Sequence, residues 1–438
     1  MPAIVEKQAK EERMLPEGWS VERLGNVVTI GSGQVDPREE PYSSMLHVGA
    51  EDIESGTGRL LQPQTCSELG LISGKYEFDE HAVIYSKIRP HLNKVCFPGA
   101  RGVCSADAYP LWPKPNVLLP KYLKYVLLSP DFVKYAVSCS MRTGMPKINR
   151  EDLLASSIPI PSIREQEEIA TILEHWDIAI SSTERLLANR FAQKLALLAK
   201  FGMPVPKPGR GRASGGAYPP SVQPGVPKLP PTPSDWRKTT LAQHLTEVVR
   251  PAALIDQESY TLVTVRRSRG GVDKRSVLLG SQIKTPTQFY VKSGDFLISK
   301  RQIVHGACGI VPEHLDGAVV SNEYAVLNTD DRLDARFLAY LAETTYFQQT
   351  CFHSSIGVHI EKMLFNLDRW LSWPFNIPPL EVQLRIVEQL DAASKEIRLA
   401  ERQVELLKTE KQALMADLLT GKRRVRTAAK PAQAQEPA

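Results

Sequence analysis

One stretch of the sequence occurs twice in similar form, as IPIPSIREQEEIATIL at 158–173 and FNIPPLEVQLRIVEQL at 375–390. The matching residues lie 217 positions apart (383 − 166): Pro161 and Pro378, Gln166 and Gln383, Ile169 and Ile386, Leu173 and Leu390. Solenoid repeats are about 20–50 residues long, so this period is too long for a solenoid. It indicates two copies of one domain, each followed by a helix.

Other landmarks recur in the same order. Trp19 in PEGWSVERL and Trp236 in PSDWRKTTL are again 217 positions apart (236 − 19). Lys87 in AVIYSKIRP corresponds to Lys300 in DFLISKRQI at a separation of 213 (300 − 87). The glycines of RTGMPKI and SIGVHI keep that same separation of 213 (357 − 144). The order of these landmarks predicts a tandem duplication.

Each copy combines short β-rich segments with a pair of helices. NVVTI, HAVIYSKI, DFLIS, ACGIV and NEYAVL are bounded by Gly, Pro, Asp and Ser, as strands usually are. The segments 122–140 and 337–355 have a helical pattern, and each precedes a last strand, SIPIP or WPFNIP. We therefore predict an α/β (α+β) fold for each half.

A long helix follows each copy. Apolar residues of the second helix alternate at spacings of four and three from Ile386 to Leu418, and Lys411 is the charged exception in this seam. Residues 163–200 would form a helix roughly 57 Å long at about 1.5 Å per residue. Neither long helix has a domain core of its own to pack on. Because a 3.5-residue seam is typical of coiled coils, we expect two long antiparallel coiled-coil helices. The predicted packing residues are Ile169, Leu173, Trp176, Ile180, Leu187, Ile386, Leu390, Ile397, Val404, Leu407 and Leu414.

Composition limits the class of protein. The 438 residues carry a net charge of +5, with 24% charged and 42% hydrophobic residues, which is ordinary for a globular protein. No apolar run reaches the ~20 residues of a membrane span, and the polar N-terminus is unlike a signal peptide. The six cysteines have no CxxC spacing, so we expect free thiols in the cytoplasm and no membrane partner. Cys351, His353 and His359 lack a fourth ligand at zinc spacing, so we predict no metal there.

Searches for catalytic motifs give little. TIGSGQV at 29–35 lacks the third glycine and the downstream acid of a dinucleotide fingerprint, and GxxxxGK[ST], HExxH and GxSxG are missing. NIPPL at 376–380 resembles the Asn-Pro-Pro-Tyr of amino-methyltransferases, but Ile377 interrupts it and no aromatic residue follows. We therefore expect no catalytic residue, bound cofactor or metal in this chain.

Local basic clusters are the strongest functional signal. Acidic and basic residues nearly balance within each half, so the excess positive charge lies in the linker and in the tail GKRRVRTAAK. Gly and Pro alternate with Arg and Lys in several segments, as in loops that approach a phosphate backbone or read guanine edges. Solvated surface loops are the simpler alternative. The candidate DNA-binding residues are Lys87, Arg89, Lys94, Arg101, Arg142, Lys147, Arg150, Arg266, Arg267, Arg269, Lys300 and Arg301.

These features together resemble the specificity subunit of type I restriction–modification systems. The resemblance covers the chain from Leu15 to Arg424 and is most specific in LPEGWSVERLG, YSKIRPHLNK, TGMPKINREDL, IPIPSIREQEEIATIL and LMADLLTGKRRV. The chain departs from the family pattern in four places. They are the ending ALLAKFG of the first helix, the long linker, the segment SIGVHIEKML, which matches TGMPKIN only in part, and Ser394, which stands in the second copy where the first has Asp177.

The resemblance implies two target-recognition domains joined by the two helices. It divides the chain into an N-terminal extension (1–14), a first target-recognition domain (15–162), a spacer helix (163–202), a Pro/Gly-rich linker (203–233), a second target-recognition domain (234–379), a second spacer helix (380–421) and a basic, disordered tail (422–438). Each domain is expected to bind one part of a bipartite, asymmetric site on double-stranded DNA.

The resemblance also implies partners that carry the chemistry. Two copies of a modification subunit would bring S-adenosylmethionine and methylate adenine. A restriction subunit would bring ATP and Mg²⁺ for cleavage. Two other functions stay open at this point: a helical scaffold with non-specific DNA binding, and a stand-alone DNA methyltransferase or nuclease.

Overall fold

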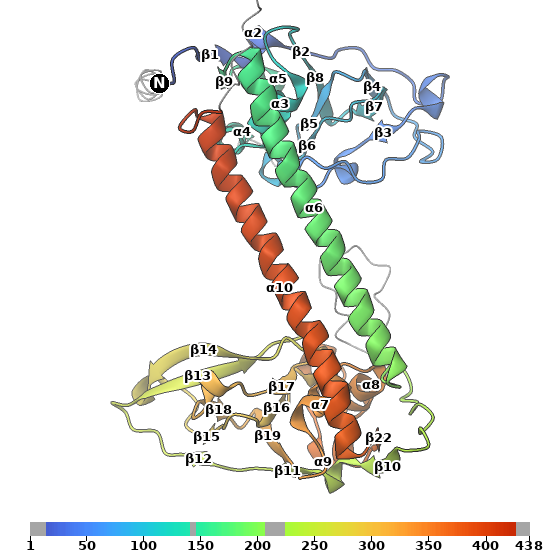
Figure 1. The fold of residues 1–438 in the computed structure, drawn as a ribbon, viewed down its shortest axis with the longest axis vertical. Helices are drawn as coiled ribbons and strands as arrows, with labels where there is room; N and C mark the ends of the chain where they lie inside the picture. Colours follow the sequence, from blue (N-terminus) through green and yellow to red (C-terminus); the bar gives the residue numbers. More distant parts are fainter. Residues whose placement is uncertain (1–14, 141–145, 206–223, 426–438) are drawn as a thin grey trace, which may run out of the picture. The chain divides into compact units, whose positions relative to one another are not determined.

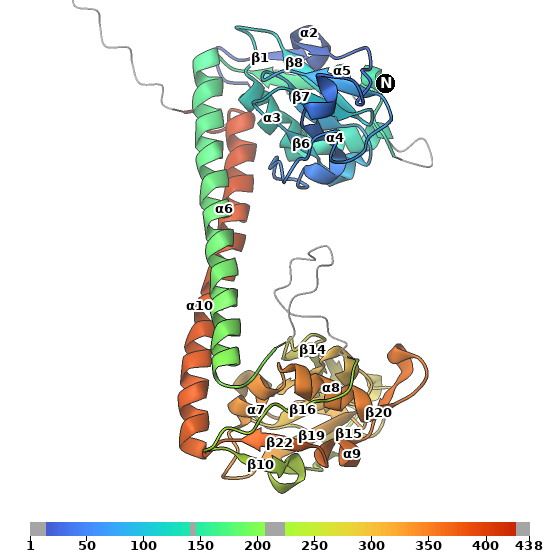
Figure 2. The same cartoon turned by 90° about the vertical axis from the view of Figure 1, so that its right-hand side faces the viewer.

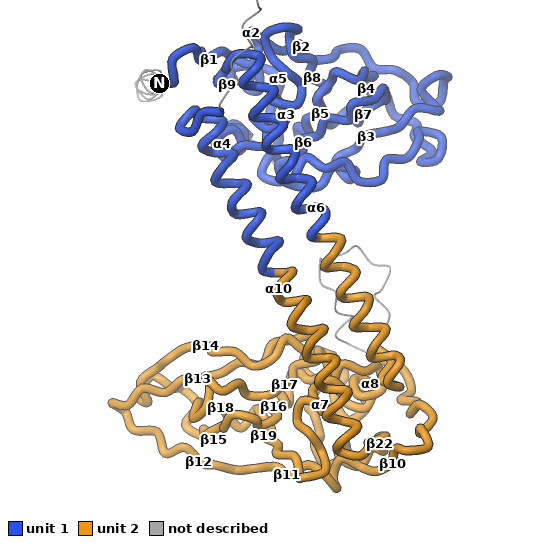
Figure 3. The backbone as a smooth tube through the Cα atoms, viewed as in Figure 1, with its two compact units in different colours: residues 1–183, 402–438 blue, residues 184–401 orange. Residues whose placement is uncertain are grey.

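The structure is a computed structural model that describes residues 15–140, 146–205 and 224–425. The predicted N-terminal extension, most of the predicted linker and the tail beyond 425 lie outside these residues. The chain divides into two compact units, residues 1–183 with 402–438 and residues 184–401 (Figure 3). Each unit contains an α/β domain and a segment of both long helices (Figure 1).

Unit 1 contains nine strands and four short helices among its described residues. The strands are β1 (Ser20–Arg23), β2 (Val28–Ile30), β3 (His47–Val48), β4 (Lys75–Phe78), β5 (Val83–Ser86), β6 (Val95–Cys96), β7 (Gly102–Ser105), β8 (Ala108–Pro113) and β9 (Ser157–Ile160). The helices are α2 (Leu24–Val27), α3 (Pro120–Leu128), α4 (Pro130–Ser140) and α5 (Arg150–Leu154).

Unit 2 contains thirteen strands and three short helices among its described residues. The strands are β10 (Arg237–Thr240), β11 (Leu245–Glu247), β12 (Pro251–Ala252), β13 (Ser259–Val265), β14 (Val272–Leu279), β15 (Gln288–Tyr290), β16 (Phe296–Ser299), β17 (Cys308–Ile310), β18 (Val319–Ser321), β19 (Tyr324–Thr329), β20 (Ser355–Ile356), β21 (Leu364–Phe365) and β22 (Pro374–Ile377). The helices are α7 (Ala335–Leu341), α8 (Thr345–His353) and α9 (Leu367–Leu371).

The two units share the main features of their sheet topology. A four-stranded antiparallel sheet has the order β2-β8-β5-β6 in unit 1 and β11-β19-β16-β17 in unit 2. A second sheet pairs one strand in parallel, β3 with β7 in unit 1 and β13 with β18 in unit 2. The first and last strands of each copy also pair, β1 with β9 and β10 with β22. This repeated topology agrees with the predicted duplication.

The layers follow from the alternation of side chains along the central strands. Successive side chains of a strand point to opposite faces, and both faces of β5 and β16 are apolar. Val83 and Tyr85 belong to the core that contains α3 and α4, whereas Ile84 belongs to the core beneath the second sheet. Phe296 and Ile298 pack with α7 and α8 in the same way, whereas Leu297 contributes to the other core.

The repeated glutamine explains the phrase that occurs twice. Gln166 and Gln383 are 0% exposed. The amide of Gln166 accepts from Leu119 N at 2.9 Å and donates to the carbonyls of Val117 and Pro161 at 2.9 and 3.0 Å. Gln383 makes three equivalent bonds at 2.8, 2.8 and 2.9 Å, to Asp334 N, Arg332 O and Pro378 O. Each glutamine therefore fastens the start of a long helix to the loop before its domain's helical pair.

The long helices are α6 (Ile163–Lys200) and α10 (Leu380–Leu419). Segments of the two helices run antiparallel within each unit, because the early part of one meets the late part of the other (Figure 2). The fold is therefore the predicted pair of mixed α/β halves with two long helices packed together. No helix among the described residues has the length and apolarity that a membrane span requires.

The structure differs from the sequence prediction in two local details. Asn26 and Val27 of the predicted strand NVVTI belong to α2, because Leu24 and Val27 are buried one helical turn apart. In unit 2 the segment after β13 forms a long hairpin with β14, whereas unit 1 has an irregular loop after β3. Similar α/β composition in the two halves gave no signal for this difference.

Candidate nucleic-acid interface

The two central strands end at lysines in equivalent positions. Lys87 follows β5 and Lys300 follows β16. The carbonyl of Lys87 accepts a hydrogen bond from Ile148 N at 3.0 Å, and that of Lys300 accepts one from Phe365 N at 2.9 Å. In both units, therefore, the loop after the central strand meets the loop that contains the TGMPKIN phrase or its counterpart.

In unit 1 this meeting brings two of the basic clusters together. Ile88 bridges to Lys147, and Arg89 N donates to Pro146 O at 2.7 Å. Arg89 and Lys147 are exposed, and neither makes an ion pair within the described part of unit 1. Two unpaired cationic side chains on adjacent loops are suited to contact phosphates.

Lys87 and Arg150 lie beside this pair but are partly engaged. The ammonium of Lys87 is 3.8 Å from the Asp107 carboxylate and donates to Ala106 O at 2.5 Å. The guanidinium of Arg150 donates to Gly31 O at 2.6 Å. These bonds fix the two side chains at the rim of the loops, and Arg150 stays exposed.

The other candidates of unit 1 lie apart from this group. Lys94 donates to Ala50 O, so it supports the neighbouring loop. Arg101 lies in the turn between β6 and β7 and donates to Glu77 Oε1 at 3.3 Å. Arg142 lies outside the described residues.

In unit 2 the tip of the β13–β14 hairpin supplies the basic cluster. Ser268 N donates to His305 O at 2.6 Å, and Arg269 N donates to Gly306 O at 2.9 Å. Ser268 and Arg269 both have positive φ, at 55° and 62°, as a tight turn at this tip requires. The hairpin tip therefore lies against the loop that starts at Lys300.

The cationic side chains of this cluster have acidic neighbours that the sequence did not predict. The ion pairs are Arg266–Asp273, Arg267–Glu361 at 2.8 Å, Lys300–Glu247 at 3.6 Å and Arg301–Glu323 at 2.5 Å. Burial, with the nearby Arg267 charge, lowers the pKa of His305, although Glu361 opposes this. Exposed ion pairs contribute about 0–1 kcal/mol each, so exchanging an acid for a phosphate costs little.

An apolar loop that the sequence analysis did not select lies beside Lys300. Ile356 at the end of β20 is exposed, as are Ile360 and Val358 between β20 and β21, and Val358 is 96% exposed. Gly357 has a φ of 154°, and an added Cβ would meet the Met363 backbone at 3.0 Å. The sequence signal was the segment SIGVHI, whose apolar residues do not continue into a longer strand or helix pattern.

The residues predicted to pack between the helices are all at least partly buried in α6 and α10. Ile169, Leu173, Ile386, Leu390, Ile397 and Val404 are buried, and Trp176, Ile180, Leu187, Leu407 and Leu414 are half-buried. Other apolar side chains of the same helices are exposed: Ile178, Leu186, Leu384, Leu399 and Leu406. Both helices therefore also expose apolar side chains besides those that they bury.

The residues considered for catalysis or metal binding make contacts that stabilise the fold. The amide of Asn376 in NIPPL donates to Pro230 O at 2.9 Å and accepts from Thr232 Oγ1 at 2.7 Å. Within the described ranges, Cys351, His353 and His359 do not form a cluster of metal ligands. All six cysteines are free thiols.

Comparison with known proteins gives consistent results. The family model described as "Type I restriction modification DNA specificity domain" matches residues 16–189. The specificity subunit of the type I restriction enzyme EcoDI from Escherichia coli is 35% identical over 184 residues, 42% of this chain and 40% of that protein. The MjaVIII specificity subunit from Methanocaldococcus jannaschii is 23% identical over an alignment that covers 94% of each protein.

Solved structures share the fold along nearly the whole chain. A protein of a type I R-M system has a TM-score of 0.54 at 19% identity, covering 93% of this chain and 99% of that one. The type I restriction–modification S subunit from M. genitalium has a TM-score of 0.53 at 12% identity, covering 92% and 96%. The repeated fold, the family model over residues 16–189 and the two relatives agree, and the chain is similar to the specificity subunits of type I restriction–modification systems.

Proposed function

We propose that this chain recognises DNA for a type I restriction–modification complex, with each unit binding one part of a bipartite, asymmetric site. The observation that carries the proposal is the repeated junction at Lys87 and Lys300, where a basic loop after the central strand meets a second loop through one equivalent backbone hydrogen bond. A duplicated surface of this kind suits two separate segments of duplex.

The two units are expected to read DNA differently. Among the described residues, Arg89 and Lys147 of unit 1 make no ion pair, whereas Arg267 and Arg301 of unit 2 have acidic neighbours and an apolar loop lies beside Lys300. Arginine can bind a guanine edge with two hydrogen bonds, and an apolar side chain can contact the methyl group of thymine. These differences support an asymmetric site.

The exposed apolar face of the long helices supports a docking role. Ile178 and Leu406 lie in unit 1, and Leu186, Leu384 and Leu399 lie in unit 2. Apolar patches of this kind mark protein–protein contacts. The proposed partner is the modification subunit in two copies, and a restriction subunit joins where the system cleaves DNA.

The chemistry belongs to these partners in this proposal. A specificity subunit is a non-catalytic component, which agrees with the expectation that this chain is no enzyme by itself. S-adenosylmethionine is assigned to the modification subunit, and ATP with Mg²⁺ to the restriction subunit. All of them would work in the cytoplasm, where the DNA is.

The test compares two sets of variants in the complex with the modification subunit. Arg89→Ala and Lys147→Ala are each expected to weaken DNA binding and to lower its salt slope by about one unit for a phosphate contact. Lys114→Ala is the matched control. Lys114 is exposed and comes directly after β8, whereas Asp107, the neighbour of Lys87, comes directly before β8. Normal binding by both loop variants, or an equal loss in the control, would contradict the proposed interface.

A further inference from the structure

His47 of β3 is a buried side chain with no hydrogen-bond partner on its ring. The residue is 3% exposed, and neither Nδ1 nor Nε2 is bonded to any group among the described residues. An unsatisfied buried polar group costs about 1–3 kcal/mol, so such a group needs an explanation. An apolar side chain at this position would avoid the cost of two buried nitrogen atoms without partners.

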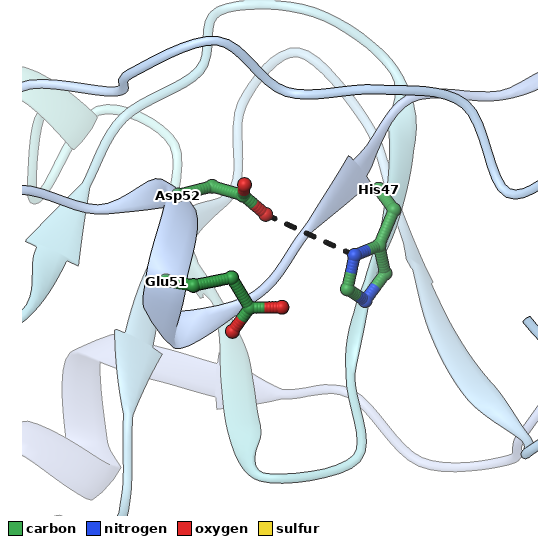
Figure 4. A group of neighbouring side chains, drawn as sticks. All are labelled: His47, Glu51 and Asp52. Carbon is green, nitrogen blue, oxygen red and sulfur yellow. Dashed lines mark ion pairs between the residues drawn. The ribbon is translucent and has the colours of Figure 1, made fainter. Parts of the chain in front are cut away.

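The ring of His47 faces two carboxylates from the same short segment. Asp52 Oδ2 is 3.9 Å from His47 Nδ1, and one ligand atom from each of His47, Glu51 and Asp52 lies within 4.8 Å of the others. Figure 4 shows the three side chains pointing toward one another from β3 and the adjoining 3₁₀ helix Ala50–Asp52. Within the described ranges this is the one such group of three potential ligands.

The local backbone holds this arrangement in place. Gly49 N donates to Asp52 Oδ2 at 2.7 Å, which orients that carboxylate. A Cβ at Gly49 would lie 2.5 Å from Glu51 Oε1, so the glycine leaves room for the second carboxylate. Leu61 N donates to Asp52 O at 2.7 Å and ties the following loop to the same turn.

We propose that His47, Glu51 and Asp52 bind a divalent transition-metal cation of the Zn²⁺ or Mn²⁺ class. One imidazole nitrogen and two carboxylate oxygens are ordinary ligands for these ions, with bonds of about 2.0–2.2 Å. Ligand atoms around such an ion are about 3–3.5 Å apart on these bond lengths, so the group must contract slightly. Glu51 is exposed and can move inward.

The charges of the surroundings are compatible with a cation. Burial lowers the pKa of His47, so the ring is neutral and offers a lone pair. The nearby Lys75 ammonium donates hydrogen bonds of 2.6 Å to the carbonyl and the hydroxyl oxygen of Ser73. Lys94 is likewise bonded, to Ala50 O. Both lysines keep their positive charge, so the two carboxylates must offset the charge of the ion in the presence of these ammonium groups.

The second unit indicates what the ion would do. His47 pairs in parallel with Val103 of β7, and Leu262 pairs in parallel with Val319 of β18, so Leu262 is the equivalent residue. Unit 2 continues from there into a hairpin that is paired along its length, whereas unit 1 has only isolated bridges in the loop after β3. The ion would fasten that loop, and this role is independent of DNA binding.

The test is equilibrium dialysis of the full-length chain, first stripped with a chelator, against micromolar ZnCl₂. The expected result is one bound zinc per chain, with affinity at least about tenfold lower in Glu51→Gln and in His47→Leu. His47→Leu introduces the residue found in unit 2, and Glu51→Gln alters an exposed side chain, so at least the second variant is expected to fold. Co²⁺ in place of Zn²⁺ should give visible absorption bands in the wild type that both variants lack.

The matched control is His244→Gln in unit 2. His244 is buried and its Nδ1 is 3.2 Å from Asp330, but that carboxylate is already bonded by Arg332. This control should bind zinc as the wild type does. The proposal is overturned if the wild type binds no stoichiometric metal, if Glu51→Gln binds it unchanged, or if the control loses it equally.

Discussion

Lys194 and Lys411 lie 217 positions apart (411 − 194), and both are buried beside a tyrosine and an acid of their unit. The ammonium of Lys194 is 5.2 Å from the ring centre of Tyr340, and that of Lys411 is 5.4 Å from the ring centre of Tyr125. Lys194 pairs with Glu343 at 2.8 Å, and Lys411 pairs with Asp177. Each long helix thus carries one lysine, at the repeat spacing, into the unit at its far end.

Lys411→Met and Lys194→Met are therefore expected to destabilise different units. Each removes one partner of a largely buried ion pair, and we expect a loss of about 1–3 kcal/mol. Hydrogen exchange should increase around α3 for Lys411→Met and around α7 for Lys194→Met. Arg190→Ala breaks the exposed pair with Glu396 and serves as the control, with an expected effect below about 1 kcal/mol. Unchanged exchange in both lysine variants would show that these pairs do not support the units.

Gln166→Ala and Gln383→Ala should be among the most damaging single changes in this chain. Each leaves one backbone N–H and two carbonyls without their partner in a buried site, and the expected loss is on the order of 3 kcal/mol. Thermal unfolding of the full-length variants measures it. Replacing Gln193 by Ala is the control, because its side chain is exposed on the same helix. A loss no larger than that of the control would refute the fastening role.

Glu165 predicts a pH dependence that is specific to unit 1. Burial alone would raise the pKa of Glu165, but hydrogen bonds from Arg424, Ser162 and Trp19 outweigh it and lower the pKa below its ordinary 4.5. Because the folded-state pKa is depressed, this contribution is complete above pH 4.5 and is lost as the pH falls through the folded-state value.

Glu165→Gln should therefore be less stable than the wild type by about 1 kcal/mol at neutral pH, and the difference should shrink below pH 4.5. Thermal unfolding across this range measures the difference. Unit 2 has Val382 at the equivalent position, so Val382→Gln is a control without such a pH dependence. A wild-type advantage that persists in acid would contradict the assigned cause.

Val358 predicts an effect on recognition without an effect on stability. Its side chain is 96% exposed beside the Lys300 loop, so Val358→Ser should leave thermal unfolding unchanged. If it contacts a thymine methyl, the variant should lose about 1–3 kcal/mol of discrimination at one position of one half-site. Binding to a set of single-base variants of the site measures this. Val226→Ser, which changes another exposed valine of unit 2, should leave every position as it was.

The architecture could largely be predicted from the sequence because the duplication repeats the residues that mark the ends of domains and the starts of helices. Gln166 and Gln383 marked the starts of the helices, and the 3.5-residue seam predicted their packing. The chemistry of those residues was less accessible. Lys411 was noticed only as an exception in the seam, since its pairing with Asp177 depends on how α10 returns to unit 1.

The candidate interface was predicted only in part. Clusters of Arg and Lys are visible in a sequence, but the acids that approach them come from distant segments, as Glu361 does for Arg267. The same limit hid the metal-ligand group, because the burial of His47 follows from the parallel pairing of β3 with β7. Local composition carries no information about either contact.

We propose that the paired helices also set the length of the unspecific spacer between the two half-sites, and a heptad insertion tests this role. Each unit holds its own paired segments of α6 and α10, so seven residues added after Thr183 and seven after Glu401 leave both pairs intact. The insertion lengthens each helix by about 10.5 Å and keeps the seam in phase. At about 3.4 Å per base pair, this corresponds to at most about three base pairs.

The decisive measurement is genome-wide sequencing of methylated adenines in cells that carry the modification subunit with either the wild-type or the inserted chain. Both half-site sequences should stay the same while the unspecific spacer between them grows by up to about three base pairs. A two-residue insertion at the same points, which turns the seam away from its partner, should abolish methylation. An altered half-site, or an unchanged spacer in an active complex with the heptad insertion, would contradict the account.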